Sequence, residues 1–223
     1  MKRGITPQQP IKLKISLEGL PFRVTRKVLV PHNTNLIQLH VVLQYAMGWM
    51  GGHLFQFRDR RTYPGVIASY ADDPEFFIDE VEETPAHRVK LHSLYNFRQG
   101  LPFWYWYDFG YDWWHKVSFL VPSRRDLGLF ELFGEQPLCV EAEGKCPPED
   151  VGGVFGFEQF CQVINDPNHE EYQSYRHWLG LDMDAPYDLM QVDVLAINNS
   201  LRDFFNSDRW KWESDRFFRE GLI

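Results

Sequence analysis

Apolar and polar residues alternate regularly near the start of the chain. Residues 11–17 (IKLKISL) have period two, which predicts a half-buried strand. A Gly-Leu-Pro turn at 19–21 follows, and residues 22–30 (FRVTRKVLV) predict a second strand that ends at Pro31. The chain is therefore expected to open with two strands joined by a short turn.

A helical period replaces this alternation after Pro31. Apolar residues recur at spacings of three and four, at Leu36, Leu39, Val42, Leu43 and Met47. Asn33 or Thr34 is expected to cap this helix, and Gly48 to end it. Residues 53–59 (HLFQFRD) predict a third strand. The order strand, strand, helix, strand indicates a small α+β unit.

The middle of the chain contains an acidic excursion and an aromatic hairpin. Residues 64–90 predict a surface loop with one short strand at 76–79, and 91–97 predict a short helix. Residues 101–110 and 113–121 then predict two strands joined by a tight turn around Gly110. The first strand carries Phe103, Tyr105 and Tyr107 on one face and Trp104 and Trp106 on the other. Because both faces are aromatic, we expect a strand that is covered on both sides.

The last third of the chain is expected to be mainly helical. Residues 122–153 show no clear periodicity, whereas 155–166, 168–180 and 187–205 predict helices, the last starting near Asp184 to Asp188. These helices would pack on a mixed or antiparallel sheet, which makes the fold class α+β. We expect one domain over residues 1–206, with 1–63 and 88–206 as its sub-units, followed by an aromatic tail at 207–223.

Composition and charge narrow the classes of partner. The 223 residues carry 23 Lys and Arg against 31 Asp and Glu, and aromatic residues make up 16%. The formal charge of -8 disfavours nucleic acid unless a local basic patch overrides it. The local candidates are Arg58, Arg60, Arg61, Arg124 and Arg125. The three cysteines and the lack of a leader or apolar span favour a cytoplasmic protein that does not insert into a membrane.

Several stretches in a fixed order resemble a known family. They are residues 43–57 (LQYAMGWMGGHLFQF), 107–115 (YDFGYDWWH), 144–153 (GKCPPEDVGG), 165–180 (NDPNHEEYQSYRHWLG) and 183–189 (MDAPYDL). Over roughly residues 11–201 the chain resembles the Ri-plasmid open-reading-frame-three-like family, also labelled transposon passenger proteins. The resemblance implies a soluble α+β protein of plasmids, transposons and prokaryotic genomes, without an established activity. Tyr111-Asp112 stands where the family usually has two aspartates.

Carboxylates and a histidine surround the turn of the aromatic hairpin. Asp108, Asp112 and His115 are the catalytic candidates, and together with the distant Glu149 they are the candidate ligands of a divalent metal. The structural alternative is that both aspartates accept hydrogen bonds from turn amides and that His115 is an ordinary strand residue.

The segment 139–153 (CVEAEGKCPPEDVGG) is a second candidate for chemistry. It forms either a rigid acidic loop that lines a pocket beside the hairpin, or a long connection stiffened by Pro147 and Pro148. On the first alternative, the ligand-binding candidates are Tyr107, Trp113, Glu149 and Asp150.

Two further histidines are interpreted as packing residues. They are His40, on the first helix, and His53, at the start of the third strand. His53 can meet His115 only if their strands are neighbours, which the sequence leaves open.

Three functions follow from these patterns. The leading hypothesis is a non-enzymatic binding or protein-interaction module, with the aromatic tail as the contact to a partner or to a second copy of the chain. The first alternative is a metal-dependent, hydrolase-like enzyme whose carboxylates and histidine at the hairpin hold a divalent cation. The second is a DNA-associated accessory protein of a mobile element.

Overall fold

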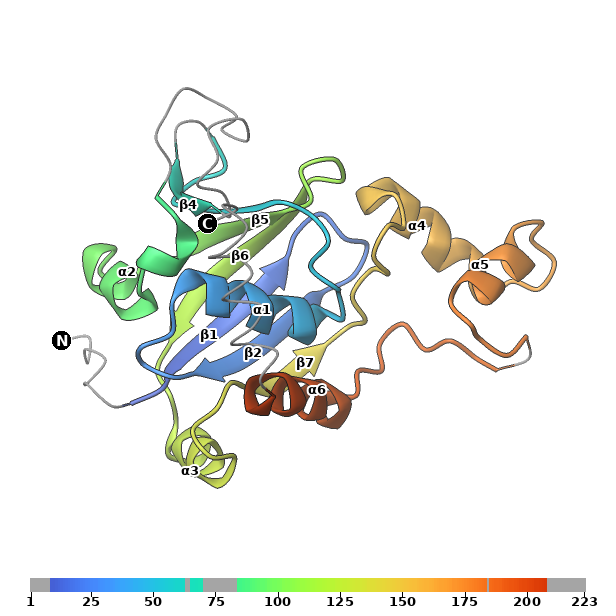
Figure 1. The fold of residues 1–223 in the computed structure, drawn as a ribbon. Helices are drawn as coiled ribbons and strands as arrows, with labels where there is room; N and C mark the ends of the chain where they lie inside the picture. Colours follow the sequence, from blue (N-terminus) through green and yellow to red (C-terminus); the bar gives the residue numbers. More distant parts are fainter. Residues whose placement is uncertain (1–8, 63–64, 70–83, 184, 208–223) are drawn as a thin grey trace.

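The computed structural model describes residues 9–62, 65–69, 84–183 and 185–207 (Figure 1). Seven strands of these residues form one sheet in the order β4-β3-β5-β6-β1-β2-β7. The strands are β1 (Ile11–Leu17), β2 (Val24–Val30), β3 (Phe55–Arg58), β4 (Val66–Ser69), β5 (Phe103–Tyr107), β6 (Trp113–Leu120) and β7 (Leu138–Glu143). Every neighbouring pair is antiparallel, so the α+β class with an antiparallel sheet is confirmed.

Most helices lie on one face of this sheet or beyond its edges. The helices are α1 (Leu36–Met47), α2 (Leu91–Phe97), α3 (Arg124–Leu132), α4 (Gly153–Val163), α5 (Tyr172–Trp178) and α6 (Val194–Asn206), with a short 3-10 helix η2 (Ala86–Arg88). Of these, α3 packs against Leu29 on the opposite face. Figure 1 shows α1 lying across the sheet, while α4 and α5 reach out past its edge. Among the described helices, none combines the length and apolar character needed to cross a membrane.

The face of the sheet that is turned toward α1, the inner face, holds the core. Strand register places Tyr105 between Phe57 and His115 on this face, and all three side chains are fully buried. The Tyr105 hydroxyl contacts α1, where it lies 2.7 Å from Nδ1 of His40 and accepts a hydrogen bond from Gln44. The opposite side, the outer face, carries the alternate residues of each strand.

The sequence-based boundaries hold best where the pattern is longest. The strands at 11–17 and 22–30, the helix after Pro31 and the helix at 91–97 are confirmed with small shifts. The cap of α1 is Asn35, whose side chain and that of Gln38 form a capping box, so the choice of Asn33 or Thr34 was wrong.

Other expectations need correction. The segment 122–153 contains α3 and β7, and the last helix begins only at Val194 because Asp193 caps it. Trp104 and Trp106 are only half-buried, so β5 is fully covered on its inner face alone. The strand expected at 76–79 and nearly all of the tail at 207–223 lie outside the described residues.

Candidate functional site

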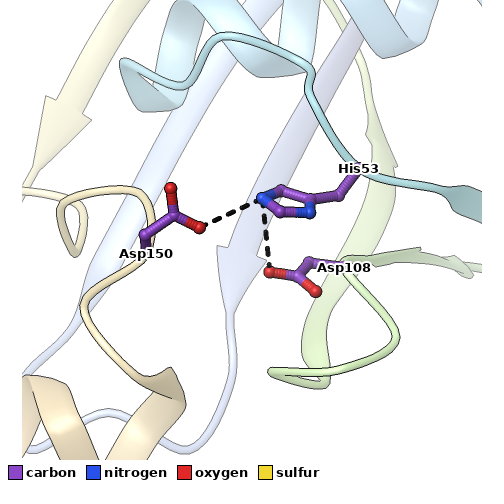
Figure 2. A group of neighbouring side chains, drawn as sticks. All are labelled: His53, Asp108 and Asp150. Atoms are coloured by element: carbon purple, nitrogen blue, oxygen red, sulfur yellow. Dashed lines mark hydrogen bonds and ion pairs between the residues drawn. The ribbon is translucent and has the colours of Figure 1, made fainter.

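Three polar side chains from separate segments converge at one end of β5 (Figure 2). Nε2 of His53 lies 3.8 Å from Oδ2 of Asp108 and 3.2 Å from Oδ1 of Asp150. The three donor atoms all lie within 4.8 Å of one another, in a spacing that one metal ion can bridge. We call these residues the three-donor site.

Strand pairing brings the first two donors together. β3 and β5 are antiparallel neighbours, with Phe55 opposite Tyr107. The start of β3 therefore lies beside the end of β5, and the backbone N–H of Asp108 donates to the carbonyl of Leu54 at 2.9 Å. His53, just before β3, and Asp108, just after β5, are adjacent for this reason.

The hairpin turn fixes the direction of the Asp108 side chain. Asp108 has φ 53°, a left-handed conformation that aspartate tolerates better than most residues. Its Oδ1 accepts hydrogen bonds from the amides of Gly110 and Tyr111, at 3.2 and 3.3 Å. The other carboxylate oxygen, Oδ2, is left to face His53.

A glycine-rich loop brings the third donor to the hairpin. Asp150 is also left-handed, with φ 63°, and Gly152 and Gly153 follow at φ 96° and 71°. A Cβ on Gly153 would lie 3.2 Å from the carbonyl oxygen of Tyr111, so glycine permits the close approach of loop and turn. The Asp150 side chain itself is 63% exposed, which leaves the site open to solvent on this side.

Hydrogen bonds brace the loop behind the donors. Glu149 accepts from the Tyr107 hydroxyl at 2.5 Å and from the backbone N–H of Met50 at 2.8 Å. Burial, together with the Glu149 carboxylate, raises the pKa of Tyr107, so its hydroxyl stays a donor. The indole of Trp49 donates to the carbonyl of Pro147 at 2.8 Å. The segments that carry His53 and Asp150 are thereby joined.

A buried arginine fixes the same two segments further back. Arg26 is 2% exposed, and its guanidinium donates to the carbonyls of Ala46, at the end of α1, and of Gly144, after β7. Burial lowers its pKa, and the carbonyl oxygens take the place of a carboxylate partner. Arg26 thus holds the ends from which the two site loops depart.

Asp112 is directed to a different place. Its Oδ1 accepts from the indole N–H groups of Trp106 and Trp114, at 2.8 and 2.7 Å. Both tryptophans belong to the outer face, because they are opposite each other in the β5–β6 pair. Asp112 is therefore not brought into the three-donor site.

His115 and Trp113 lie inside the core. Burial lowers the pKa of His115 to about 3, and within the described residues its Nε2 has no hydrogen-bond partner. β5 separates its strand from β3, so His115 and His53 are not on neighbouring strands. Trp113 is 2% exposed and packs on Trp49. The structure does not group either residue with the donors.

His53 is the residue that sequence reasoning assigned to packing. The structure places it at the centre of the three donors, with Asp108 on one side and Asp150 on the other. Its position directly before a strand that follows Gly51-Gly52 is the local feature that could have drawn attention to it.

Sequence comparison gives these residues a family context. The sequence profile of the plasmid pRiA4b ORF-3-like proteins matches residues 9–196, most of the chain. The chain belongs to the plasmid pRiA4b ORF-3-like family. All members of the three-donor site lie within the part of this ORF-3-like protein that the profile matches.

Two relatives of this ORF-3-like protein extend the comparison. The uncharacterized protein y4hQ of Sinorhizobium fredii is 36% identical over 195 residues, covering 86% of this chain and 91% of that protein. The crystal structure of MM3350, a protein of unknown function from Methanosarcina mazei Go1, is similar with a TM-score of 0.65 and 27% identity. The similarity covers 85% of this chain and 98% of that one. Neither name states an activity.

Proposed function

We propose that this ORF-3-like protein binds one divalent cation at the three-donor site and acts as a cation-dependent binding module. The observation that carries the proposal is the convergence of one imidazole nitrogen and two carboxylate oxygens at 3.2 and 3.8 Å. Ligand atoms held about 2.1 Å from a common metal lie roughly 3.0–3.4 Å apart. A bound cation requires only a small inward shift of the side chains.

The donor set favours a particular class of metal. Imidazole suits zinc and similar transition metals, whereas two carboxylates also suit manganese and magnesium. One histidine with two aspartates therefore favours Zn²⁺ or Mn²⁺ over Ca²⁺, which prefers six to eight oxygen ligands.

Two left-handed aspartates support a role for the site beyond packing. Asp108 and Asp150 adopt φ 53° and 63°, conformations that cost roughly 1 kcal/mol or more for residues other than glycine. Strained backbone is often found at ligand sites, where the surrounding structure enforces it. A cation that neutralises the two carboxylates would offset part of this cost.

A binding role is favoured by the way the neighbouring acid is used. Glu149 accepts hydrogen bonds from Tyr107 and Met50, so both of its oxygens brace the loop. A general base for hydrolysis needs an oxygen free to take a proton from water. The proposal includes the cytoplasmic, reducing setting expected from the sequence, in which the three free cysteines would persist.

Metal-dependent hydrolysis is the second candidate, and one observation favours it. Catalytic metal sites combine three protein ligands with an open position for water, and the three-donor site has three donors with Asp150 63% exposed. If the protein turns over a phosphoester or peptide substrate in a cation-dependent way, and Asp150→Asn abolishes this turnover, the hydrolase function replaces the binding function.

The first experiment measures cation binding directly. Protein stripped with a chelator is titrated with Zn²⁺, Mn²⁺, Mg²⁺ and Ca²⁺ by calorimetry, and the melting temperature is followed in parallel. One Zn²⁺ or Mn²⁺ per chain is expected, with a gain of about 2.7 kcal/mol at a hundredfold excess over Kd. For a chain of this size the gain corresponds to roughly 5–10 °C.

Matched variants assign the binding to the three-donor site. Asp150→Asn is expected to weaken binding at least about 100-fold, because it removes a direct ligand. Asp166→Asn, a change at an exposed aspartate of another loop, is expected to leave the affinity unchanged. A stripped protein without affinity for any of these cations would leave His53 as a polar neighbour of two aspartates and refute the proposal.

A further inference from the structure

The outer face of the sheet carries an aromatic and cationic band across neighbouring strands. Register places Trp104 of β5 between Arg58 of β3 and Lys116 of β6. Lys116 is in turn opposite Ser16 of β1, which is opposite Thr25 of β2. Residues that face each other in antiparallel pairs share one side of the sheet, so the band is continuous.

The cations in this band differ in their pairing. On the same face, Lys12 binds Asp126 and Lys27 binds Glu141, each at 2.7 Å. Within the described residues, Lys14, Arg61 and Lys116 form no ion pair. In the described residues the outer face therefore carries three cations without an ion-pair partner, alongside the carboxylates of Asp112 and Glu18, although the whole chain has a formal charge of -8. This local balance is the basic patch that the net charge conceals.

The tryptophans of the band are also used unequally. Trp106 stacks on Phe109 and on Trp114, with ring centroids 4.1 and 5.0 Å away, and Arg58 lies over its ring at 5.5 Å. Trp106 is therefore already engaged by its neighbours. Trp104 meets Trp114 edge-on at 6.2 Å and has Arg61 5.6 Å from its centroid. Within the described part of the chain no aromatic ring lies parallel to half-buried Trp104, and Arg61 is over this ring, so a stacking base would share Trp104 with the guanidinium.

A polar hollow continues the band along β1 and β2. The open hollow has a volume of about 530 Å³, and Lys14, Ser16, Arg23 and Thr25 contribute cations and hydroxyls to its lining. Glu18 also lines it. Ammonium, guanidinium and hydroxyl groups are the side chains that bind phosphate oxygens in nucleic-acid complexes.

We propose that the outer face binds single-stranded nucleic acid. An unpaired base stacks on Trp104, and the adjoining phosphates contact Lys116 and then Lys14 at the hollow. Stacking on an aromatic side chain combined with backbone contacts to cations is the general mode of single-strand recognition. A duplex keeps its bases stacked on each other, so it cannot use Trp104 in this way.

The test uses fluorescence anisotropy with the full chain. The probes are labelled oligothymidine and oligouridine of about 20 nucleotides, and a duplex of equal length, at roughly 50 mM salt and above. Single strands are expected to bind at least tenfold tighter than the duplex, with an affinity that falls as salt rises. The DNA and RNA probes distinguish which nucleic acid is preferred.

Variants locate the binding on the outer face. Lys14→Ala with Lys116→Ala should lower the affinity at least tenfold and reduce the slope of log affinity against log salt by about two. Trp104→Ala should lower it at least about fivefold. Lys90→Ala with Arg202→Ala removes two cations located elsewhere and should change nothing, and melting temperatures verify that each variant folds.

Three results would overturn the proposal. They are absence of binding at low salt, equal affinity for the duplex, and equal loss in the Lys90 and Arg202 control. Asp108→Asn, which removes a donor of the three-donor site, should leave oligonucleotide binding unchanged. The outcome is therefore independent of cation binding.

Discussion

Asp108 and Asp112 lie in the same hairpin turn, both in the left-handed conformation, at φ 53° and 60°. Asp108 presents Oδ2 to His53 beside the inner face, whereas Asp112 accepts two indole N–H groups on the outer face. Residue type and backbone conformation are thus alike, and the chemistry differs. The difference teaches that the neighbours of each aspartate decide its role: for Asp108 the start of β3, which is distant in sequence, and for Asp112 the nearby tryptophans of β5 and β6.

Converting each aspartate separately to asparagine tests the difference between them most directly. Asp108→Asn keeps an acceptor for the turn amides but removes the charge, so we expect at least a 100-fold loss in Zn²⁺ or Mn²⁺ affinity. Asp112→Asn keeps an acceptor for both indoles and should change the affinity less than threefold, about 0.7 kcal/mol. Calorimetric titration of the two stripped variants measures both. Equal losses would place Asp112 in the metal site.

A second contrast is between His53, at the three-donor site, and His115, in the core. Burial lowers the pKa of His115 to about 3, from an ordinary value of 6.5. Between about pH 3 and pH 6.5, His115 is protonated in the unfolded chain and neutral in the folded chain. Its contribution to the free energy of unfolding is therefore intact above pH 6.5 and is lost as the pH falls. The free energy of unfolding should drop by about 1.4 kcal/mol per pH unit, or roughly 2 kcal/mol at pH 5.

His115→Leu tests this pH dependence. Denaturant unfolding between pH 7 and pH 5 should show a shallower decline in stability for the variant. Burial also lowers the pKa of His40 to about 3, so His40 still contributes a decline in stability in the variant. An unchanged pH profile in His115→Leu would contradict the burial of a neutral imidazole.

The loop behind Asp150 offers a sharper test of positioning. Trp49→Phe keeps a ring in place but removes the N–H that donates to the Pro147 carbonyl. We expect about a tenfold loss in cation affinity, as for other residues that orient ligands. Zn²⁺ titration of the stripped variant measures the loss. An unchanged affinity would show that Glu149 and Arg26 are sufficient to hold the loop.

The smallest effect separates strain from hydrogen bonding at Asp112. Both Asp112→Ala and Asp112→Gly remove the acceptor of the two indole N–H groups, but only alanine adds a Cβ at φ 60°. The alanine variant should therefore be less stable by about 1 kcal/mol. Denaturant unfolding of the pair measures the difference. Equal stability would show that the turn relaxes when the carboxylate is lost.

Local pattern accounts for what the sequence reveals about the fold. β1 alternates in residue type because one of its faces is buried, and α1 has an apolar stripe, whereas β5 (FWYWY) is aromatic on both faces and alternates only in burial. β7 lacks such a period at its start: Cys139 is buried among the inner-face core, and Leu138 is buried against Leu29 and Phe130. Two covered sides give two consecutive apolar residues, so no alternation marks the strand.

The candidate site was only partly accessible to sequence reasoning, for a different physical reason. Asp108 and Asp150 stood out because carboxylates next to turn residues and glycines are conspicuous. His53 did not, since its partners come from elsewhere in the chain and Asp150 is 97 residues away. Its role depends on the pairing of β3 with β5, a non-local contact that the spacing of apolar residues along the sequence does not indicate. His115 was chosen as a candidate because it is close in sequence to Asp108 and Asp112, although its side chain faces the core.

The long separation of these donors also bears on folding kinetics. Asp150 follows β7, the last strand in sequence, which joins the sheet at its edge beside β2. A cation held by both His53 and Asp150 can bind only after nearly the whole sheet has assembled. It would then stabilise the native state more than the transition state, and so lower the unfolding rate while leaving the folding rate nearly unchanged. Cation binding late in folding would thus prolong the lifetime of the folded chain.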